Sequence, residues 1–354
     1  MKMVMIEDLK AGMILAEPVI GNFELIYANS DETITEQMIE GFERLNVAYV
    51  FIKDDVPTTE VDTISQELTG EMLMASENYG EMLDMMRHVF SDFQFLDKKV
   101  LDKVKTPMDD LINSVSKNTG ILLKLKRLYL KDEYSLTHSV HVCLLSAMIA
   151  KWNGLGKKDI QSIALAGLFH DLGKSKIPDD ILNKPGDLEP HEFSVMKRHS
   201  ELGYKIARSQ DVFEKDVLRG IIEHHERLDG SGYPFGLKKD QIHPYAQIIA
   251  IADVYDAMTT ERSYKNSESP FVAVEVIKDL SYKNHLHPGL VNRFLKNIYR
   301  LYIGSEVVLS NGLSGEIVYI NKFAPERPLI RLDNMDFIDL YTRSDVKIKN
   351  FKIA

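Results

Sequence analysis

Histidine and aspartate residues recur through one long block of the chain, and this pattern constrains the fold more than any other feature. Neutral imidazoles and carboxylates are good ligands for first-row divalent metals, and a mixed set suits iron, manganese or zinc. We expect the whole dispersed pattern to belong to one helical domain. The candidate metal ligands are His138, His170, Asp171, His199, His224, His225 and Asp253.

Two pairs of these residues are adjacent in sequence. Neighbouring side chains on an α-helix diverge by about 100°, because the helix has ~3.6 residues per turn. His170 and Asp171 can therefore approach one ion together only near a helix end or bend, and Gly173 supplies such a break. A carboxylate has two oxygens, so Asp171 can bridge two cations. A single histidine is more often a hydrogen-bonded core or surface residue, but the adjacent His224-His225 is costly to place without a partner.

Apolar spacing predicts a mainly α protein. The block 131–301 is expected to be an all-helical domain, with helices starting near Tyr134 and over Lys157–His170. Short apolar runs predict a small β-rich N-terminal domain over 1–57 and a β-rich C-terminal segment over 302–354, in which Asn311-Gly312 indicates a hairpin. The part between, 58–130, is expected to be a helical connector whose methionines pack against another helix.

Composition excludes some classes of protein. The chain has 354 residues and a net charge of −10, which argues against a protein that coats nucleic acid. Its single cysteine, Cys143, excludes an intramolecular disulfide. No apolar stretch approaches the ~18 residues needed to cross a bilayer, and no signal-peptide pattern is present, so a cytoplasmic protein is expected.

Two longer motifs surround the adjacent pairs. They read His-Asp-Leu-Gly-Lys over 170–174 and His-His-Glu-Arg-Leu-Asp-Gly-Ser-Gly-Tyr-Pro over 224–234. Both resemble the signature motifs of HD-GYP phosphodiesterases, a family within the HD superfamily of metal-dependent phosphohydrolases. His138, His199 and Asp253 match the remaining ligand positions in order and spacing. The resemblance covers about 134–301 and implies an HD-type catalytic domain.

The resemblance also implies an activity and its metals. The family hydrolyses cyclic di-GMP to pGpG, often onward to GMP. One metal, iron or manganese, would be held by His138, His170, Asp171 and Asp253. A second would be held by His199, His224 and His225, with Asp171 as the bridge and a catalytic residue. Family members with a third metal carry a glutamate where this chain has Tyr134, so two metals are expected. A water shared by two cations yields hydroxide near neutral pH, and this hydroxide would attack the phosphorus.

Further roles are implied at matching positions. Lys174 would contact the phosphate or act near the leaving group, although on its own it reads as a surface lysine. Arg262 and Lys265 match residues that contact the phosphates and guanine, and Asp256 would orient Arg262 or touch a base. Tyr233 would face the substrate or a partner. The loop Gly232-Tyr233-Pro234 is a candidate docking site for a GGDEF-type cyclase domain, and a homodimer through the connector is a further expectation.

Two alternatives stay open from the residues alone. The substrate could be another cyclic dinucleotide or a nucleotide phosphate, which substitution of Arg262 or Lys265 would help to decide. The chain could also act mainly as a signalling adaptor that docks cyclase domains through Tyr233.

Overall fold

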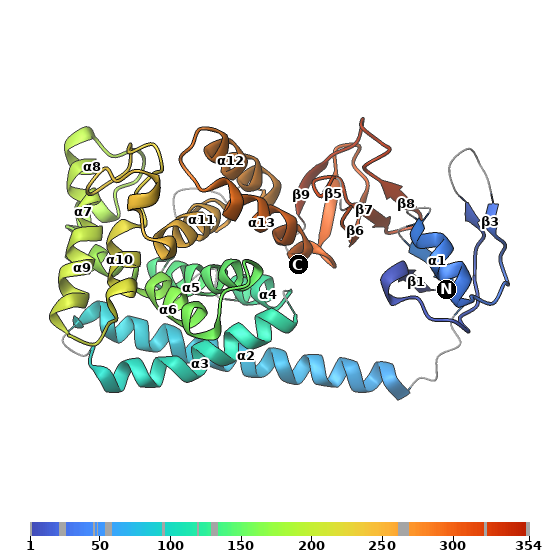
Figure 1. Ribbon diagram of the computed structural model, residues 1–354, viewed down its shortest axis with the longest axis horizontal. Helices are drawn as coiled ribbons and strands as arrows, with labels where there is room; N and C mark the ends of the chain where they lie inside the picture. The colour runs from blue at the N-terminus through green and yellow to red at the C-terminus, as the bar shows by residue number, and fades with distance from the viewer. Residues whose placement is uncertain are drawn as a thin grey trace. The chain divides into compact units, whose positions relative to one another are not determined.

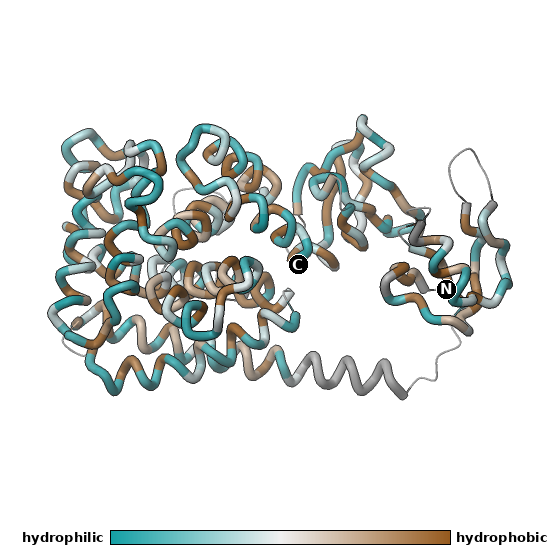
Figure 2. The backbone as a smooth tube through the Cα atoms, in the orientation of Figure 1, coloured by the Kyte–Doolittle hydropathy of each residue, from teal (hydrophilic) through white to brown (hydrophobic). Residues whose placement is uncertain are grey.

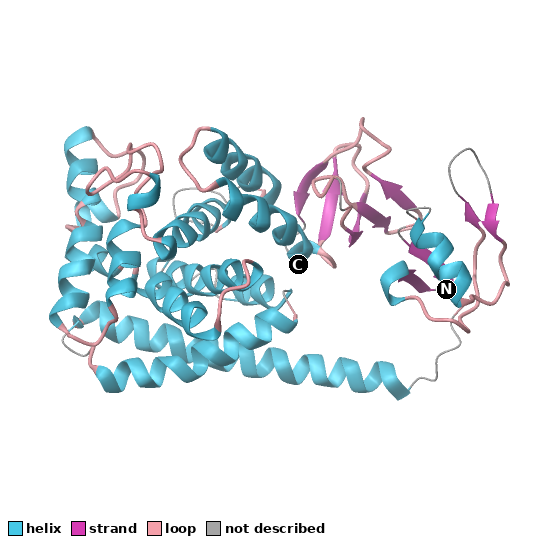
Figure 3. Ribbon diagram, in the orientation of Figure 1, coloured by secondary structure: helices cyan, strands magenta, loops and turns pink. Residues whose placement is uncertain are grey.

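The computed structural model describes residues 2–20, 26–44, 47, 49–53, 59–93, 96–118, 120–128, 134–260, 269–321 and 324–351. The chain forms two compact units, Met1–Gly70 and Glu71–Ala354. Helices dominate the described residues, as Figure 3 shows, and the expectation of a mainly α protein is confirmed. No helix among the described residues has both the length and the apolar character needed to cross a membrane.

The first unit is small and mixes strands with short helices. Strand β1 (Lys2–Met5) pairs antiparallel with β4 (Tyr49–Ile52), and β2 (Val19–Ile20) pairs antiparallel with β3 (Ile26–Ala28). Helix η1 (Ile6–Asp8) and helix α1 (Glu36–Arg44) complete the unit. Its own core contains Leu15, Ile34, Phe42, Val50 and Ile52.

Three connector helices lead into the second unit. Helix α2 (Thr59–Ser91) crosses the boundary between the units, and α3 (Lys98–Lys117) and α4 (Gly120–Leu128) follow it. Asp97 caps α3 by accepting a hydrogen bond from the Val100 backbone N–H. The buried face of α2 includes Met82 and Met86, which belong to the main core, whereas Met74 is exposed.

The central helices of the second unit carry most of the core (Figure 1). Every residue of α5 (Tyr134–Trp152) from Leu136 to Ala150 is buried, so this helix is covered on all sides. It packs closely on α6 (Lys157–Phe169), where a Cβ on Gly167 would lie 3.1 Å from the Val142 carbonyl oxygen. Figure 2 shows the hydrophobic stretches along both helices. The remaining elements are η4 (Leu172–Lys176), α7 (Asp179–Leu182), α8 (Pro190–Lys197), α9 (His199–Ser209), α10 (Lys215–Glu223), η5 (Lys239–Gln241), α11 (Pro244–Thr259), α12 (Pro270–Tyr282), α13 (Pro288–Ile298) and η6 (Tyr299–Tyr302).

A five-stranded antiparallel sheet ends the chain, with strand order β8-β7-β6-β5-β9. The turn between the first two of its strands contains Gly312 at φ 86°, and the hairpin expected at Asn311-Gly312 is confirmed. Val307, Ile317 and Ile330 join the core of the helical domain, so the sheet belongs to the second unit. The strands are β5 (Glu306–Leu309), β6 (Ser314–Tyr319), β7 (Leu329–Leu332), β8 (Phe337–Asp339) and β9 (Ile348–Phe351).

Candidate metal centre

The fold brings all seven candidate ligands into one buried cluster. Most of them lie at helix ends, where adjacent side chains can converge. His170 and Asp171 fill the junction between α6 and η4, and His224-His225 directly follow α10. His199 is the first residue of α9, whereas His138 and Asp253 project from within α5 and α11.

Asp171 lies between two groups of histidines. Its Oδ2 is 3.3 Å from His170 Nε2 and 3.7 Å from His138 Nε2. Its other oxygen, Oδ1, is 3.4 Å from His199 Nε2. The two oxygens of one carboxylate therefore face two different sets of ring nitrogens, which is the arrangement that a bridging ligand requires.

The hydrogen bonds of three histidines reveal which ring nitrogens are free to bind a cation. The Nδ1 atoms of His170, His199 and His224 lie 2.7–2.8 Å from the backbone carbonyl oxygens three residues earlier. A carbonyl oxygen can only accept, so each Nδ1 carries a proton, and in the neutral ring each Nε2 then presents a bare lone pair. His199 Nε2 and His224 Nε2 face each other at 3.4 Å, and two lone pairs cannot hydrogen-bond. A cation bound between them would satisfy both lone pairs.

The donor set fits divalent metal ions. One group of ligand atoms comes from His138, His170 and Asp171, and another from His199, His224 and His225; within each group the atoms lie within 4.8 Å of one another. His170 Nε2 and Asp171 Oδ1 are buried without a hydrogen-bond partner. Buried polar atoms are rarely left so, and a metal ion would satisfy both.

The charges of the centre suit metal binding. Burial alone would raise the pKa of Asp171, but His170 and the Lys174 ammonium outweigh it and hold that pKa well below its usual range. Burial lowers the pKa of His224 and His225, so both imidazoles are neutral. His138 differs: burial opposes its protonation, yet hydrogen bonds to Asp253 and Asp256 raise its pKa to about 9. A metal ion must displace that proton.

Asp256 lies behind the ligand His138, and Arg262, which it was expected to orient, is outside the described residues. Asp256 is fully buried, and its Oδ2 accepts a hydrogen bond of 2.8 Å from His138 Nδ1. Its Oδ1 accepts from Lys126 Nζ at 2.6 Å. The carboxylate thus fixes the ring of His138 so that Nε2 points at the other ligands. Lys126 lies on helix α4, outside the two motifs, so no sequence pattern pointed to it.

The second motif is mainly a loop held by its own side chains. Glu226 is buried and accepts hydrogen bonds from the backbone N–H groups of Phe235 (2.7 Å) and Leu237 (2.9 Å). A Cβ on Gly232 would lie 2.4 Å from the Arg227 backbone nitrogen, so no larger residue fits there. These contacts place the Tyr233 ring against His225, with centroids 4.6 Å apart.

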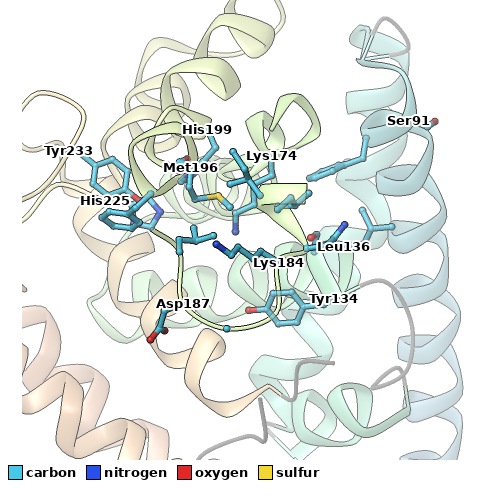
Figure 4. Close-up of a pocket in the computed structure, with 18 of the residues that line it drawn as sticks. Ser91, Tyr134, Leu136, Lys174, Lys184, Asp187, Met196, His199, His225 and Tyr233 are labelled. Atoms are coloured by element: carbon cyan, nitrogen blue, oxygen red, sulfur yellow. The ribbon is translucent and has the colours of Figure 1, made fainter. Parts of the chain in front are cut away.

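A cavity of about 1260 Å³ opens beside the centre (Figure 4). Its wall includes the ligands His199 and His225 together with Lys174 and Tyr233. Tyr134 also lines it and stacks on His138, with ring centroids 5.4 Å apart and planes within 12°. The structure thus brings Lys174 and Tyr233 to the cavity, as the sequence suggested.

Arg262 and Lys265 fall in the segment 261–268, outside the described residues.

Known proteins share both the sequence pattern and the fold. Residues 115–290 match the HD domain family. A cyclic di-GMP phosphodiesterase of Pseudomonas aeruginosa is 37% identical over 212 residues, 60% of this chain and 50% of that protein. The 3'3'-cGAMP-specific phosphodiesterase 1 of Vibrio cholerae is 42% identical over 141 residues, 39% of this chain and 32% of that protein. The chain therefore spans half or less of the length of these two relatives.

A solved structure shares the fold. Bd1817, an HDG"Y"P protein from Bdellovibrio bacteriovorus, gives a TM-score of 0.54 at 18% identity, over 84% of this chain and 99% of that chain. The helical fold and the buried histidine–aspartate cluster define an HD-domain protein. Within that class, the motifs at 170–174 and 224–234 resemble those of the HD-GYP proteins.

Proposed function

We propose that this chain is a metal-dependent phosphodiesterase that hydrolyses a cyclic dinucleotide, with cyclic di-GMP as the first candidate. The observation that carries the proposal is the convergence of bare Nε2 lone pairs on both oxygens of Asp171, next to an open cavity. The activities of the Pseudomonas aeruginosa and Vibrio cholerae relatives, as their names give them, support a cyclic dinucleotide as the class of substrate.

Two divalent cations, iron or manganese, fit the two groups of ligands. His138, His170, Asp171 and Asp253 would hold one ion, and Asp171, His199, His224 and His225 the other. When bound, the cations lower the pKa of a water molecule and neutralise charge that develops on the phosphate during hydrolysis. The presence of Tyr134 where a third ion would need a carboxylate supports two ions.

Lys174 supplies a protein cation to the same reaction. Its ammonium is 22% exposed and 2.5 Å from Asp171 Oδ2, at the wall of the cavity. A positive charge in this position attracts a phosphodiester and can hydrogen-bond the 3'-oxygen as it leaves. We assign Lys174, with Asp171, to the catalytic machinery.

The cavity can also hold the rest of a dinucleotide. Its volume of about 1260 Å³ exceeds the ~300–1,000 Å³ of ordinary small-molecule pockets. Burial raises the pKa of Tyr233, so its phenol stays protonated and can donate a hydrogen bond to substrate. Arg262 and Lys265, immediately after α11, are proposed to contact the phosphates and bases and to discriminate guanine from adenine.

The experiment compares hydrolysis of cyclic di-GMP and 3'3'-cGAMP by the purified chain loaded with Mn²⁺ or Fe²⁺. We expect conversion of cyclic di-GMP to pGpG, and the assay also shows whether GMP follows. Asp171→Asn should abolish turnover. Asp216→Asn is the matched control, because Asp216 is an exposed aspartate of the same domain that pairs with His243, which is not a candidate ligand. Faster hydrolysis of 3'3'-cGAMP would reassign the substrate, and no turnover with two bound ions would refute the proposal.

Docking of a cyclase domain stays a second prediction. The loop that contains Tyr233 ends at Phe235, which is 59% exposed and is available to a partner. Capture of a cyclase domain that persists in Asp171→Asn but fails in Phe235→Ser would support it, whereas equal capture by both variants would argue against this loop.

A further inference from the structure

A series of buried polar contacts leads from helix α2 to the metal ligand His138. We propose that Tyr79 on α2 is a positioning residue for His138 and sets the affinity of the centre for metal, acting through His141 and Asp256. This inference rests on the metal site of the proposed function, but it concerns metal binding and does not depend on which substrate is hydrolysed.

The contacts form an unbroken path. Tyr79 Oη lies 2.7 Å from His141 Nε2, and His141 Nδ1 lies 3.2 Å from Asp256 Oδ1. Asp256 Oδ2 lies 2.8 Å from His138 Nδ1. Each of the four residues is at most 1% exposed, so water does not compete for these contacts.

The direction of each hydrogen bond follows from the chemistry of the groups. An ionised carboxylate only accepts, so Asp256 receives the Nδ1–H of His138. Its negative charge also attracts the Nδ1–H of His141 across a 3.2 Å contact that does not have hydrogen-bond geometry. Burial lowers the pKa of His141, so that ring is neutral and its Nε2 is a bare acceptor. The Tyr79 hydroxyl therefore donates to His141. It holds His141 in the tautomer that points its N–H at Asp256.

Asp256 is also held by residues that are not on α2. Lys126 on α4 donates to Asp256 Oδ1 at 2.6 Å and to Thr259 Oγ1 at 3.0 Å, and Thr260 Oγ1 donates to the same Asp256 oxygen at 3.1 Å. Loss of the Tyr79 hydroxyl should therefore rotate the His141 ring or weaken its contact with Asp256, while the other contacts of Asp256 keep the domain folded. The predicted consequence is a less well oriented His138.

The orientation of His138 matters because its Nε2 must reach the other ligands. Nε2 is 3.2 Å from Asp253 Oδ1 and 3.7 Å from Asp171 Oδ2. Groups that hydrogen-bond to metal ligands typically change metal affinity by about 10–100-fold when they are removed. Tyr79 acts through two further side chains, so we expect its loss to change metal affinity by the lower end of this range, about tenfold.

Through this path, the position of helix α2 can regulate the affinity of the centre for metal. The helix runs from Thr59 to Ser91 and crosses the boundary between the two compact units at Gly70. Tyr79 lies on the part that packs into the core of the HD domain, together with Ala75, Met82 and Met86. A displacement of α2 that withdrew the Tyr79 hydroxyl would lower the affinity of the centre for metal.

The test measures metal binding by the full chain without substrate. Tyr79→Phe keeps the buried ring and removes only the hydroxyl. We expect its dissociation constant for Mn²⁺ to rise about tenfold, and the visible absorption of the Co²⁺-loaded protein to change, because that spectrum reports the geometry of the ligands. Tyr245→Phe is the matched control: it loses a 2.7 Å hydrogen bond to Asp159 within the same domain, outside the network.

A double-mutant cycle separates the path from general destabilisation. If Tyr79 acts through His141, Tyr79→Phe should have little further effect in a His141→Gln background. Mn²⁺ affinity and a Co²⁺ spectrum unchanged in Tyr79→Phe, or changed equally in Tyr245→Phe, would overturn the inference. The proposed function would fail separately, through absence of cyclic dinucleotide hydrolysis while the Tyr79 effect on Mn²⁺ binding persisted.

Discussion

Gly173 is the residue whose substitution tests the packing around the metal centre most severely. It lies in η4, two residues after Asp171, and faces the first turn of α9. A Cβ at this position would lie 1.9 Å from the backbone oxygen of the ligand His199 and 2.4 Å from the backbone nitrogen of Gly203. Both obstacles are backbone atoms, so rotation of a side chain cannot relieve the overlap in Gly173→Ala.

The size of the effect follows from these distances. A Cβ atom essentially never approaches another heavy atom closer than 3.0 Å, so η4 and α9 must separate by about 1 Å. Metal–ligand distances tolerate deviations of only about 0.2 Å. The separation would act directly between Asp171 and His199, whose ligand atoms are 3.4 Å apart. We expect Mn²⁺ affinity to fall at least 10–100-fold and the free energy of unfolding to fall by about 1–3 kcal/mol.

Isothermal titration with Mn²⁺ and urea denaturation with excess chelator measure the two quantities separately. Gly41→Ala is the matched control, because a Cβ at that helical position meets no atom within 4 Å. Replacing glycine by alanine within an exposed helix should be neutral or slightly stabilising. Gly173→Ala with the metal affinity of the unmodified chain would refute the close approach of η4 and α9.

Three further predictions concern the surroundings of the ligands. Lys126→Met leaves the buried Asp256 carboxylate without the Lys126 ammonium and should lower the free energy of unfolding by about 3–5 kcal/mol. Lys105→Met removes an exposed ion pair and should lower it by less than about 1 kcal/mol. Equal urea midpoints for the two variants would contradict this prediction. Because the metal-free centre holds a proton on His138 with a pKa of about 9, apparent Mn²⁺ affinity should rise as the pH increases toward 9. Titrations at pH 7, 8 and 9 check the sign, and a flat profile would count against it. Glu226→Gln places an amide where two backbone N–H groups need acceptors, so hydrogen exchange of the backbone over 229–237 should accelerate. Unchanged protection would show that another group holds the loop.

The sequence predicted the ligand cluster better than the residues that support it. Imidazole and carboxylate side chains in the family order were recognisable as candidate ligands, and the structure brings all seven together. Asp253 and Asp256 lie three residues apart on α11, so spacing alone places both near the same face of the helix. Only packing decides that Asp253 faces the other ligands while Asp256 lies behind His138.

Several supporting residues carried no recognisable signal. His141 matches no ligand position, and Lys126 lies outside the motifs. Their roles come from contacts between elements distant in sequence: α2 and α5 meet at Tyr79–His141, and α4 and α11 meet at Lys126–Asp256. The break attributed to Gly173 also has a different origin. Helix α6 ends at Phe169, and Gly173 is needed for the close approach of α9.

The central claim is that two ions held by one bridging aspartate perform the hydrolysis. The most direct measurement follows the rate of pGpG formation from cyclic di-GMP as Mn²⁺ is added to the metal-free chain, with the number of bound ions counted by native mass spectrometry in the same samples. We predict that activity follows the population of chains with two ions, and that Asp171→Asn never reaches this state. Full activity in chains with one ion, or no activity in chains with two, would contradict the account.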